Sequence, residues 1–226
     1  MFLKNFGYCP CCGQETQFES EGEWLRDDYK CMKCGSLPRE RALLMALEKT
    51  VPDWHEKTVF EYGSVNREVS RRLAQQSREY GSTAYDGAIW DIDRFQDAKK
   101  QYDIIITQEI LNQIYDYEQV FQQIAGQLKP GGAHIFTLPL VRKNHKSHNS
   151  IKRMNGEIFY WTGDEYMKGE PPLDMRAWEW GYDIVDRIFR TSGLFTKILT
   201  LDNLEFGVRA EYIDVMISMK PSEKLQ

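Results

Sequence analysis

The cysteines of this chain fall into two matched motifs of a kind that binds metals. Both have the form Cys-x-x-Cys-Gly, and they comprise Cys9, Cys12 and Gly13, then Cys31, Cys34 and Gly35. The glycines predict tight turns at positive φ, which would direct backbone amides toward the thiolates. Four thiolates predict a tetrahedral zinc site that is structural, because no position stays open for chemistry. Iron could occupy the same four-sulfur site.

The presence of two such motifs favours a metal site over a redox dithiol, since a single Cys-x-x-Cys would fit either interpretation. Cys11 also lies in the first motif, but the other two cysteines there have the better spacing, so Cys11 is left over. The segment between the motifs, QFESEGEWLRDDYK, can form a hairpin. A helix is expected to follow the second motif, with Ser36 as its cap and Pro38 in its first turn.

The stretch from Tyr102 to Leu140 predicts a strand, a helix and a second strand. YDIIIT is a short, β-branched apolar run, as in a strand buried on both faces of a parallel sheet. Apolar residues then recur at helical spacing between Glu118 and Leu128. Lys129-Pro-Gly-Gly132 would end that helix, and AHIFTLPL would be the second buried strand. A right-handed parallel crossover is therefore expected.

This pattern of an aspartate before an apolar strand, a KPGG after a helix and a second apolar strand resembles a known family. It is similar to the fourth-to-fifth strand region of class I S-adenosylmethionine-dependent methyltransferases. Small, type 11-like bacterial members with a zinc ribbon in front, often sugar and cell-envelope enzymes, look most similar. The resemblance implies an α/β fold: a Rossmann-like, seven-stranded, doubly wound sheet whose last strand, here Tyr212–Met219, is antiparallel. It also implies S-adenosylmethionine as cofactor.

The resemblance implies cofactor contacts at the ends of the first and fourth strands. Glu61, Tyr62 and Gly63 stand in the place of the family's first motif, an acid followed by a glycine-rich turn. Gly63 would let the loop pass beneath the cofactor's amino-acid end, and Glu61 would order that loop or reach the methionine ammonium. The family's second and third glycines are absent. Gln108 ends the fourth strand, where ligands gather in such sheets.

Further cofactor contacts are expected after the second strand. Asp86, followed by Gly87, is placed to accept hydrogen bonds from both ribose hydroxyls, although Asp-Gly is also a common turn pair. In the resembled family an acid twelve residues before the fourth strand's aspartate contacts the adenine amino group. Asp91, followed by Ile92, matches that spacing, and Asp93 is the alternative.

The segment from Val141 to Arg153, VRKNHKSHNSIKR, is strongly basic and would lie at the working edge of the sheet. Its cations could hold a phosphate or diphosphate, or the segment could be a mobile, solvated loop. His145 and His148 are the histidines placed to serve as a base near neutral pH. Resembling enzymes often carry Leu-Glu-His after the fourth strand, where this chain has Leu-Asn-Gln. The aromatic residues between Phe159 and Trp180 could stack on a sugar, close a lid or cover the sheet.

The composition limits the classes of function. A chain of 226 residues can hold one α/β domain and a small module, and its net charge of −5 disfavours nucleic acid as a partner. The first residues lack a signal peptide's apolar region, and no run approaches the ~20 apolar residues that span a bilayer. Without secretion, cysteines in this pattern are expected to bind a metal and not to form disulfides. A cytoplasmic location is therefore expected.

These observations predict three regions and one leading function. The regions are a zinc ribbon at 1–37, a linking helix at 38–55, and a methyltransferase domain at 56–226 with an insertion at about 141–180. The expected reaction moves a methyl group from S-adenosylmethionine to a small acceptor, which could bear a phosphate. A sugar or nucleotide-sugar hydroxyl in cell-envelope or natural-product biosynthesis is favoured. The alternatives are an RNA methyltransferase and a catalytically silent scaffold that keeps the fold.

Overall fold

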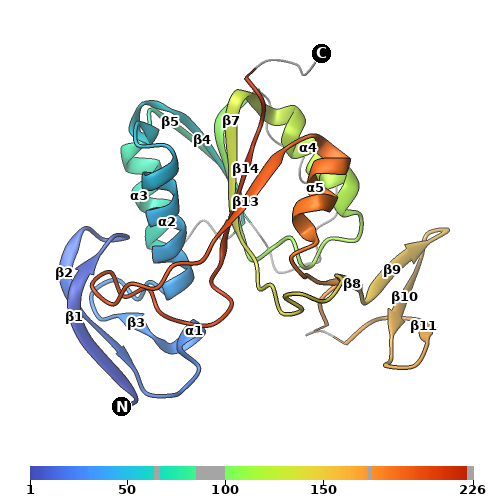
Figure 1. The fold of residues 1–226 in the computed structure, drawn as a ribbon, viewed down its shortest axis with the longest axis horizontal. Coiled ribbons are helices and arrows are strands. Elements are labelled where there is room, and N and C mark those ends of the chain that lie inside the picture. The colour runs from blue at the N-terminus through green and yellow to red at the C-terminus, as the bar shows by residue number, and fades with distance from the viewer. Residues whose placement is uncertain (64–66, 85–99, 173–174, 223–226) are drawn as a thin grey trace.

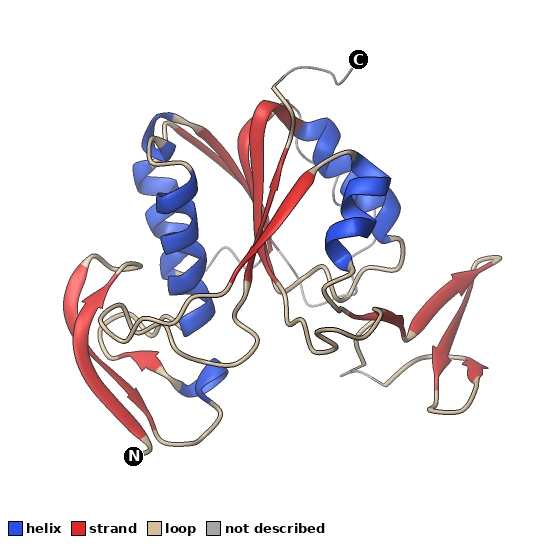
Figure 2. Ribbon diagram, viewed as in Figure 1, coloured by secondary structure: helices blue, strands red, loops and turns tan. Residues whose placement is uncertain are grey.

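A six-stranded sheet runs through the centre of the computed structural model, which describes residues 1–63, 67–84, 100–172 and 175–222 (Figures 1 and 2). The strand order is β13-β14-β7-β6-β4-β5. The strands are β4 (Thr58–Gly63), β5 (Glu79–Ala84), β6 (Tyr102–Gln108), β7 (Leu128–Thr137), β13 (Phe195–Leu199) and β14 (Val215–Met219). β5, β4, β6 and β7 are parallel, and β14 is antiparallel to both of its neighbours.

This order confirms the predicted Rossmann-like architecture with an antiparallel last strand. The seven-stranded expectation needs one more strand between the second and the fourth. That position falls within 85–99, outside the described residues. The last strand is shorter than predicted: Tyr212 has a φ of +54°, which is incompatible with an extended strand, and β14 begins only at Val215.

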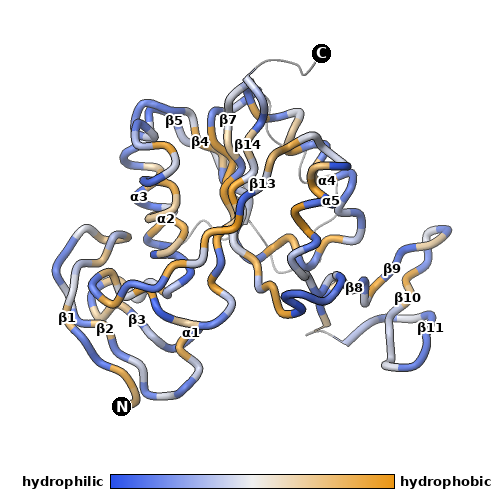
Figure 3. The backbone as a smooth tube through the Cα atoms, in the orientation of Figure 1, coloured by the Kyte–Doolittle hydropathy of each residue, from blue (hydrophilic) through white to orange (hydrophobic). Residues whose placement is uncertain are grey.

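Among the described residues, four helices cover the two faces of the sheet. α2 (Pro38–Thr50) and α3 (Glu68–Gln76) lie on one face, and α4 (Tyr117–Gln127) and α5 (Ile184–Ser192) lie on the other (Figure 1). The side chains of β6 alternate between two core clusters, because Ile104 and Ile106 pack with α2 while Ile105 packs with α4. The strand is therefore buried on both faces, as its unbroken apolar run predicts. Hydrophobic residues accordingly concentrate in the central strands (Figure 3).

The KPGG segment is not a separate turn between helix and strand. α4 ends at Gln127, and β7 begins at Leu128 and includes the KPGG residues. Within it the pairing with β6 shifts, from Tyr102 opposite Leu128 to Ile104 opposite Ala133. The two glycines thus form an irregularity inside the strand. Gly132 lies against β6 so closely that a Cβ there would be 2.9 Å from the Asp103 carbonyl oxygen.

The N-terminal module is a small antiparallel sheet of β1 (Leu3–Cys9), β2 (Gln14–Ser20) and β3 (Lys30–Cys31). The ends of the segment between the cysteine motifs pair as predicted, because β2 and β3 are antiparallel with Glu19 opposite Lys30. Their connection contains the short helix α1 (Leu25–Asp28), and β1 and β2 form another hairpin with the first motif at its tip. The linking helix is also shorter than predicted, since α2 ends at Thr50 and a 3₁₀ turn, η1 (Trp54–Glu56), follows it.

The described part of the aromatic insertion contains five short strands. β9 (Ile151–Met154), β10 (Glu157–Trp161) and β11 (Tyr166–Lys168) form an antiparallel sheet that projects away from the central sheet (Figure 1). β8 (His148–Asn149) pairs with β12 (Trp178–Glu179) beside it. Within the described part of the chain, every helix is too short or too polar to cross a bilayer.

Candidate cofactor and metal sites

The four cysteine sulfurs predicted to bind metal lie together at one end of the N-terminal module. All four Sγ atoms are within 4.8 Å of one another. The Cys9–Cys34 and Cys12–Cys31 sulfur pairs are 3.8 and 4.0 Å apart. A tetrahedral ion with bonds of about 2.3 Å would hold its sulfurs about 3.8 Å apart. The geometry therefore fits zinc, and Cys11 lies outside the group.

The two motifs have the same local structure. The amide of Gly13 donates to the Cys9 carbonyl and that of Gly35 to the Cys31 carbonyl, both at 2.8 Å. The glycines have φ values of +68° and +71°, as predicted. The positive φ explains the glycines better than crowding does, because a Cβ at Gly35 would meet open space.

Ser36 has a different role from the predicted one. Its hydroxyl does not cap α2 but lies 3.3 Å from the Cys9 sulfur and accepts from the Cys34 thiol at 3.2 Å. Glu40 caps the start of α2 instead, because its carboxylate accepts a hydrogen bond from the Leu37 amide at 2.8 Å. Ser36 is thus a neighbour of the metal ligands that sequence reasoning misses, although its place directly after the second motif is a signal.

The cysteines of the cluster shift one another's pKa values in opposite directions. Hydrogen bonds from Cys11, Cys31 and Cys34 lower the pKa of Cys9 despite its burial. Hydrogen bonding to Cys31 and Cys9, together with burial, raises the pKa of Cys34. A bound cation would favour the deprotonated form of every ligand.

Glu61 is the centre of a polar cluster on β4. Its side chain is fully buried and accepts from Ser70 (Oγ, 3.0 Å), Tyr80 (OH, 2.7 Å) and Gln108 (Nε2, 2.9 Å). Burial raises the pKa of Glu61, and the three donors act in the opposite direction. The structure therefore joins two predicted cofactor residues, Glu61 and Gln108. The two other donors come from α3 and β5, which no local sequence pattern connects.

The neighbours of Glu61 differ in what they can offer a ligand. Tyr62 points into the core between sheet and helices, where its hydroxyl donates to Gln127 Oε1 at 2.6 Å. The Tyr62 ring is therefore not available to a cofactor. Gly63 ends β4 with a φ of +134°, which an L side chain would strain. The predicted residues Asp86, Gly87, Asp91 and Ile92, with the alternative Asp93, lie outside the described residues.

The two histidines of the basic tract are separated. His145 is exposed, and its amide donates to the Arg142 carbonyl at 2.9 Å. His148 is half-buried in β8, with its ring edge-on to Trp161 at 5.7 Å. His148 lines a cavity of about 960 Å³ together with Trp161, Arg142, Arg176 and Glu179, and His145 is not among the lining residues.

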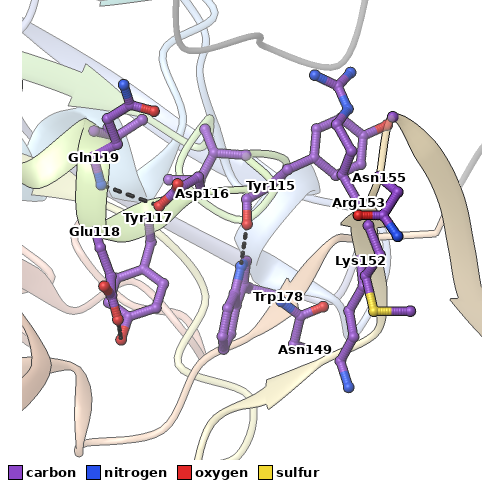
Figure 4. A pocket seen from close by; sticks show the side chains of 14 residues that line it. Tyr115, Asp116, Tyr117, Glu118, Gln119, Asn149, Lys152, Arg153, Asn155 and Trp178 are labelled. Carbon is purple, nitrogen blue, oxygen red and sulfur yellow. Dashed lines mark hydrogen bonds between the residues drawn. The ribbon is translucent and has the colours of Figure 1, made fainter.

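A second cavity, of about 600 Å³, lies between the start of α4 and β9 (Figure 4). Its lining combines aromatic rings with both signs of charge: Tyr115, Tyr117, Trp178, Asp116, Glu118, Lys152 and Arg153. The Arg153 guanidinium lies 4.7 Å from the centre of the Tyr115 ring. Such a lining can stack on a ring and hydrogen-bond to hydroxyls.

The basic tract is divided between these cavities. Arg142 bonds to Glu179 at 3.1 Å and to the Lys146 carbonyl at 2.7 Å, and Lys152 lies 3.8 Å over the Tyr166 ring. These contacts hold much of the tract against the rest of the insertion.

Comparison with known proteins places the fold. No protein-family model matches the chain, and no curated protein sequence matches it. Among solved structures, DesVI from Streptomyces venezuelae matches with a TM-score of 0.50 and 8% identity over 81% of this chain and 92% of its own. CalS10, an amino pentose methyltransferase from Micromonospora echinaspora solved with S-adenosylmethionine, matches with 0.45 and 8% over 82% and 92%. An S-adenosylmethionine-dependent methyltransferase from Clostridium acetobutylicum gives 0.44 and 13% over 80% and 91%.

At these identities the likeness shows the fold alone. The match to DesVI and the observed strand order agree, and this chain has the Rossmann-like fold of class I S-adenosylmethionine-dependent methyltransferases. The four-cysteine module is joined to that fold through α2.

Proposed function

We propose that this protein is a methyltransferase that uses S-adenosylmethionine and acts on a small acceptor. The observation that carries the proposal is the hydrogen-bonded pair of the buried Glu61 and the half-buried Gln108. They belong to adjacent parallel strands and bond to each other near the strands' carboxyl ends, where ligands bind in open α/β sheets. The three donors to the buried Glu61 carboxylate fix the end of β4, from which the first cofactor loop would leave.

The proposed cofactor contacts follow from this centre. Gly63 and Gln108 would lie at the amino-acid end, where Glu61 would order the loop or reach the methionine ammonium. Asp86 would bind the ribose and Asp91 the adenine, with Gly87 and Ile92 beside them. S-Adenosylmethionine supplies an electrophilic methyl group when it is bound. The protein's part is to align acceptor and methyl group and to exclude water, so few catalytic side chains are needed.

A sugar or nucleotide-linked sugar hydroxyl is the proposed acceptor. The aromatic and charged linings of the two cavities support it, since rings stack on sugar faces and charged groups bond hydroxyls or phosphates. A hydroxyl acceptor needs a base, and His148 is the better candidate than His145 because it lines a cavity. The same proposal includes a structural zinc site and the three regions 1–37, 38–55 and 56–226. It also includes a cytoplasmic location, which fits the five cysteines because none of them forms a disulfide.

Calorimetric titration with S-adenosylhomocysteine tests the cofactor assignment without knowledge of the acceptor. We expect a micromolar Kd in zinc-replete protein. Asp86→Ala should weaken binding by about 10-fold or more, because it removes charge-assisted hydrogen bonds. Asp53→Ala is the matched control, since Asp53 forms an ion pair with Lys57 near the start of β4. No binding to folded wild-type protein would favour the silent scaffold, and unchanged affinity in Asp86→Ala would show that the ribose contact is misassigned.

A further inference from the structure

Arg26, in the N-terminal cysteine module, reaches the carboxyl end of the central sheet. It belongs to α1, which lies below that end of the sheet in Figure 1. Its side chain is only 7% exposed. The guanidinium forms an ion pair with Glu109, the residue directly after β6, and its Nε donates to the Tyr212 carbonyl at 3.1 Å. One arginine of the module thus joins two loops at the sheet's working edge.

Arg26 also lies 3.7 Å from the Asp27 carboxylate, but its two partners at the sheet's edge have strained backbones. Glu109 has a φ of +60° and Tyr212 one of +54°, in the left-handed region that disfavours side chains. Lys143, at +45°, places its ammonium 5.2 Å from the centre of the Tyr212 ring. Three of the four non-glycine residues with positive φ in the described part of the chain therefore meet here. Such conformations persist only where surrounding contacts impose them, and they cluster at functional sites.

The turn at Glu109 determines how the chain leaves β6. Its amide donates to the Thr137 carbonyl at 2.9 Å, and the residue before it is Gln108, which bonds to Glu61. The other carboxylate oxygen of Glu109 is buried and has no hydrogen-bond partner among the described residues. Arg26 therefore provides the charged partner that holds this carboxylate in place.

A second ion pair connects the linking helix to the loop after β4. Glu40 of α2 is 4% exposed, and its Oε1 lies 3.2 Å from Nε of Arg67. Arg67 is the first described residue after Gly63 and the residue before α3. The module and its helix thus contact the chain beyond both strands that carry the Glu61–Gln108 pair.

We propose that the cysteine module is a working part of the cofactor site, with Arg26 as a positioning residue for the end of β6 and Glu40 as one for Arg67 at the start of α3. The module and its helix hold Glu109, directly after β6, and Arg67, directly before α3, which flank the proposed site for the cofactor's amino-acid end. This inference rests on the proposed function, because it assumes that the site between these loops binds S-adenosylmethionine.

The test compares the affinity for S-adenosylhomocysteine among variants of the full-length, zinc-loaded protein. Arg26→Ala should weaken binding on the order of 10-fold, a usual size for coupling between sites. The affinity of Arg26→Lys should lie between those of the wild type and Arg26→Ala. Its ammonium keeps the charge but cannot contact both Glu109 and the Tyr212 carbonyl as the guanidinium does. Arg209→Ala, which breaks an exposed ion pair with Asp202, should bind as the wild type does.

Two further measurements separate positioning from a general loss of structure. Zinc content and melting midpoint are recorded for every variant. If Arg26 acts through Glu109, the double variant Arg26→Ala/Glu109→Ala should lose no more affinity than Glu109→Ala alone. The double variant also removes both charges, so it stays informative if Arg26→Ala does not fold.

The possible failures are distinguishable. If the wild type does not bind S-adenosylhomocysteine, the proposed function is wrong and this inference falls with it. If the wild type binds, and both Arg26→Ala and the double variant bind as tightly as the wild type, the proposed function stands and the positioning role is wrong. A lowered melting midpoint with unchanged affinity also overturns the positioning role, because it assigns Arg26 to stability alone.

Discussion

At the scale of single residues, Glu61 shows what sequence reasoning can and cannot supply. Its place between an apolar strand and a glycine identifies the acid, and the structure buries it completely. Its partners Ser70 and Tyr80 could not be predicted, because they come from a helix and a strand that only the tertiary fold brings to it. Burial costs an ionised carboxylate free energy, and the three donors offset only part of that cost.

The raised pKa of Glu61 predicts how stability depends on pH. The carboxyl group ionises at about 4.5 in the unfolded chain and at a higher pH in the folded one. Its contribution to stability is therefore fully present below 4.5 and is lost as the pH rises through the folded pKa. Glu61→Gln removes this loss. We expect the melting midpoint of the variant, relative to wild type, to rise between pH 4.5 and 8 in calorimetric scans.

The matched control for that experiment has the opposite sign. Burial opposes ionisation of Asp103, but hydrogen bonds from Lys129 and Thr58 dominate and lower its pKa to about 2. Its stabilising effect, about 1 kcal/mol after allowance for solvent screening, is present above pH 3.8 and is lost toward pH 2. Asp103→Asn should therefore lose stability throughout the range in which Glu61→Gln gains it. A pH-independent difference for Glu61→Gln would contradict the burial argument.

At the scale of elements, the strands and helices follow from periodicity, but their connections do not. The unbroken apolar run of β6 and the helical spacing in α4 predict both elements and the parallel crossover. The KPGG segment predicts a turn, because its residues are those of helix ends and loops. In the structure these residues form an irregularity inside β7. Gly132 approaches the β6 backbone more closely than a residue with a Cβ could. Residue type cannot distinguish these uses, because the deciding contact comes from another strand.

The close approach of Gly132 gives a prediction with an internal control. A Cβ at Gly132 would lie 2.9 Å from the carbonyl oxygens of Asp103 and Lys129, so Gly132→Ala should destabilise the protein by about 1–3 kcal/mol. Gly126 lies inside α4, and a Cβ there would have no neighbour within 4 Å outside its helix. Gly126→Ala should stabilise by up to about 1 kcal/mol. Urea unfolding would measure both, and equal effects of the same sign would show that the contact is relieved by small backbone shifts.

At the scale of the whole molecule, the cysteine module and the sheet share one core. Cys9, Phe18 and Cys31 belong to the same buried cluster as Leu43 of α2 and Ile104 of β6. Arg41 of α2 is fully buried as well. Its side chain donates to the carbonyls of Tyr29 (2.8 Å) and Gly207 (2.7 and 3.0 Å), and it lies 4.7 Å from the Phe18 ring centre. The sequence predicts separate regions, yet these contacts make the module part of one packed unit, which local patterns cannot show.

This shared core predicts that the metal site stabilises the entire chain. Cys34→Ser should remove zinc, which atomic absorption would measure. It should also lower the temperature of the single melting transition of the whole protein, because a module that unfolds without its ion no longer packs against α2 and β6. Cys11→Ser is the control: Cys11 is buried, whereas Cys34 is half-buried, but Cys11 lies outside the four-sulfur group, so zinc content should stay near one ion per chain. A separate low-temperature transition in Cys34→Ser, with the main transition unmoved, would show that the module melts independently. Because Arg26 and Glu40 connect this unit to the loops after β6 and β4, a single transition would also mean that metal loss reaches the proposed cofactor site.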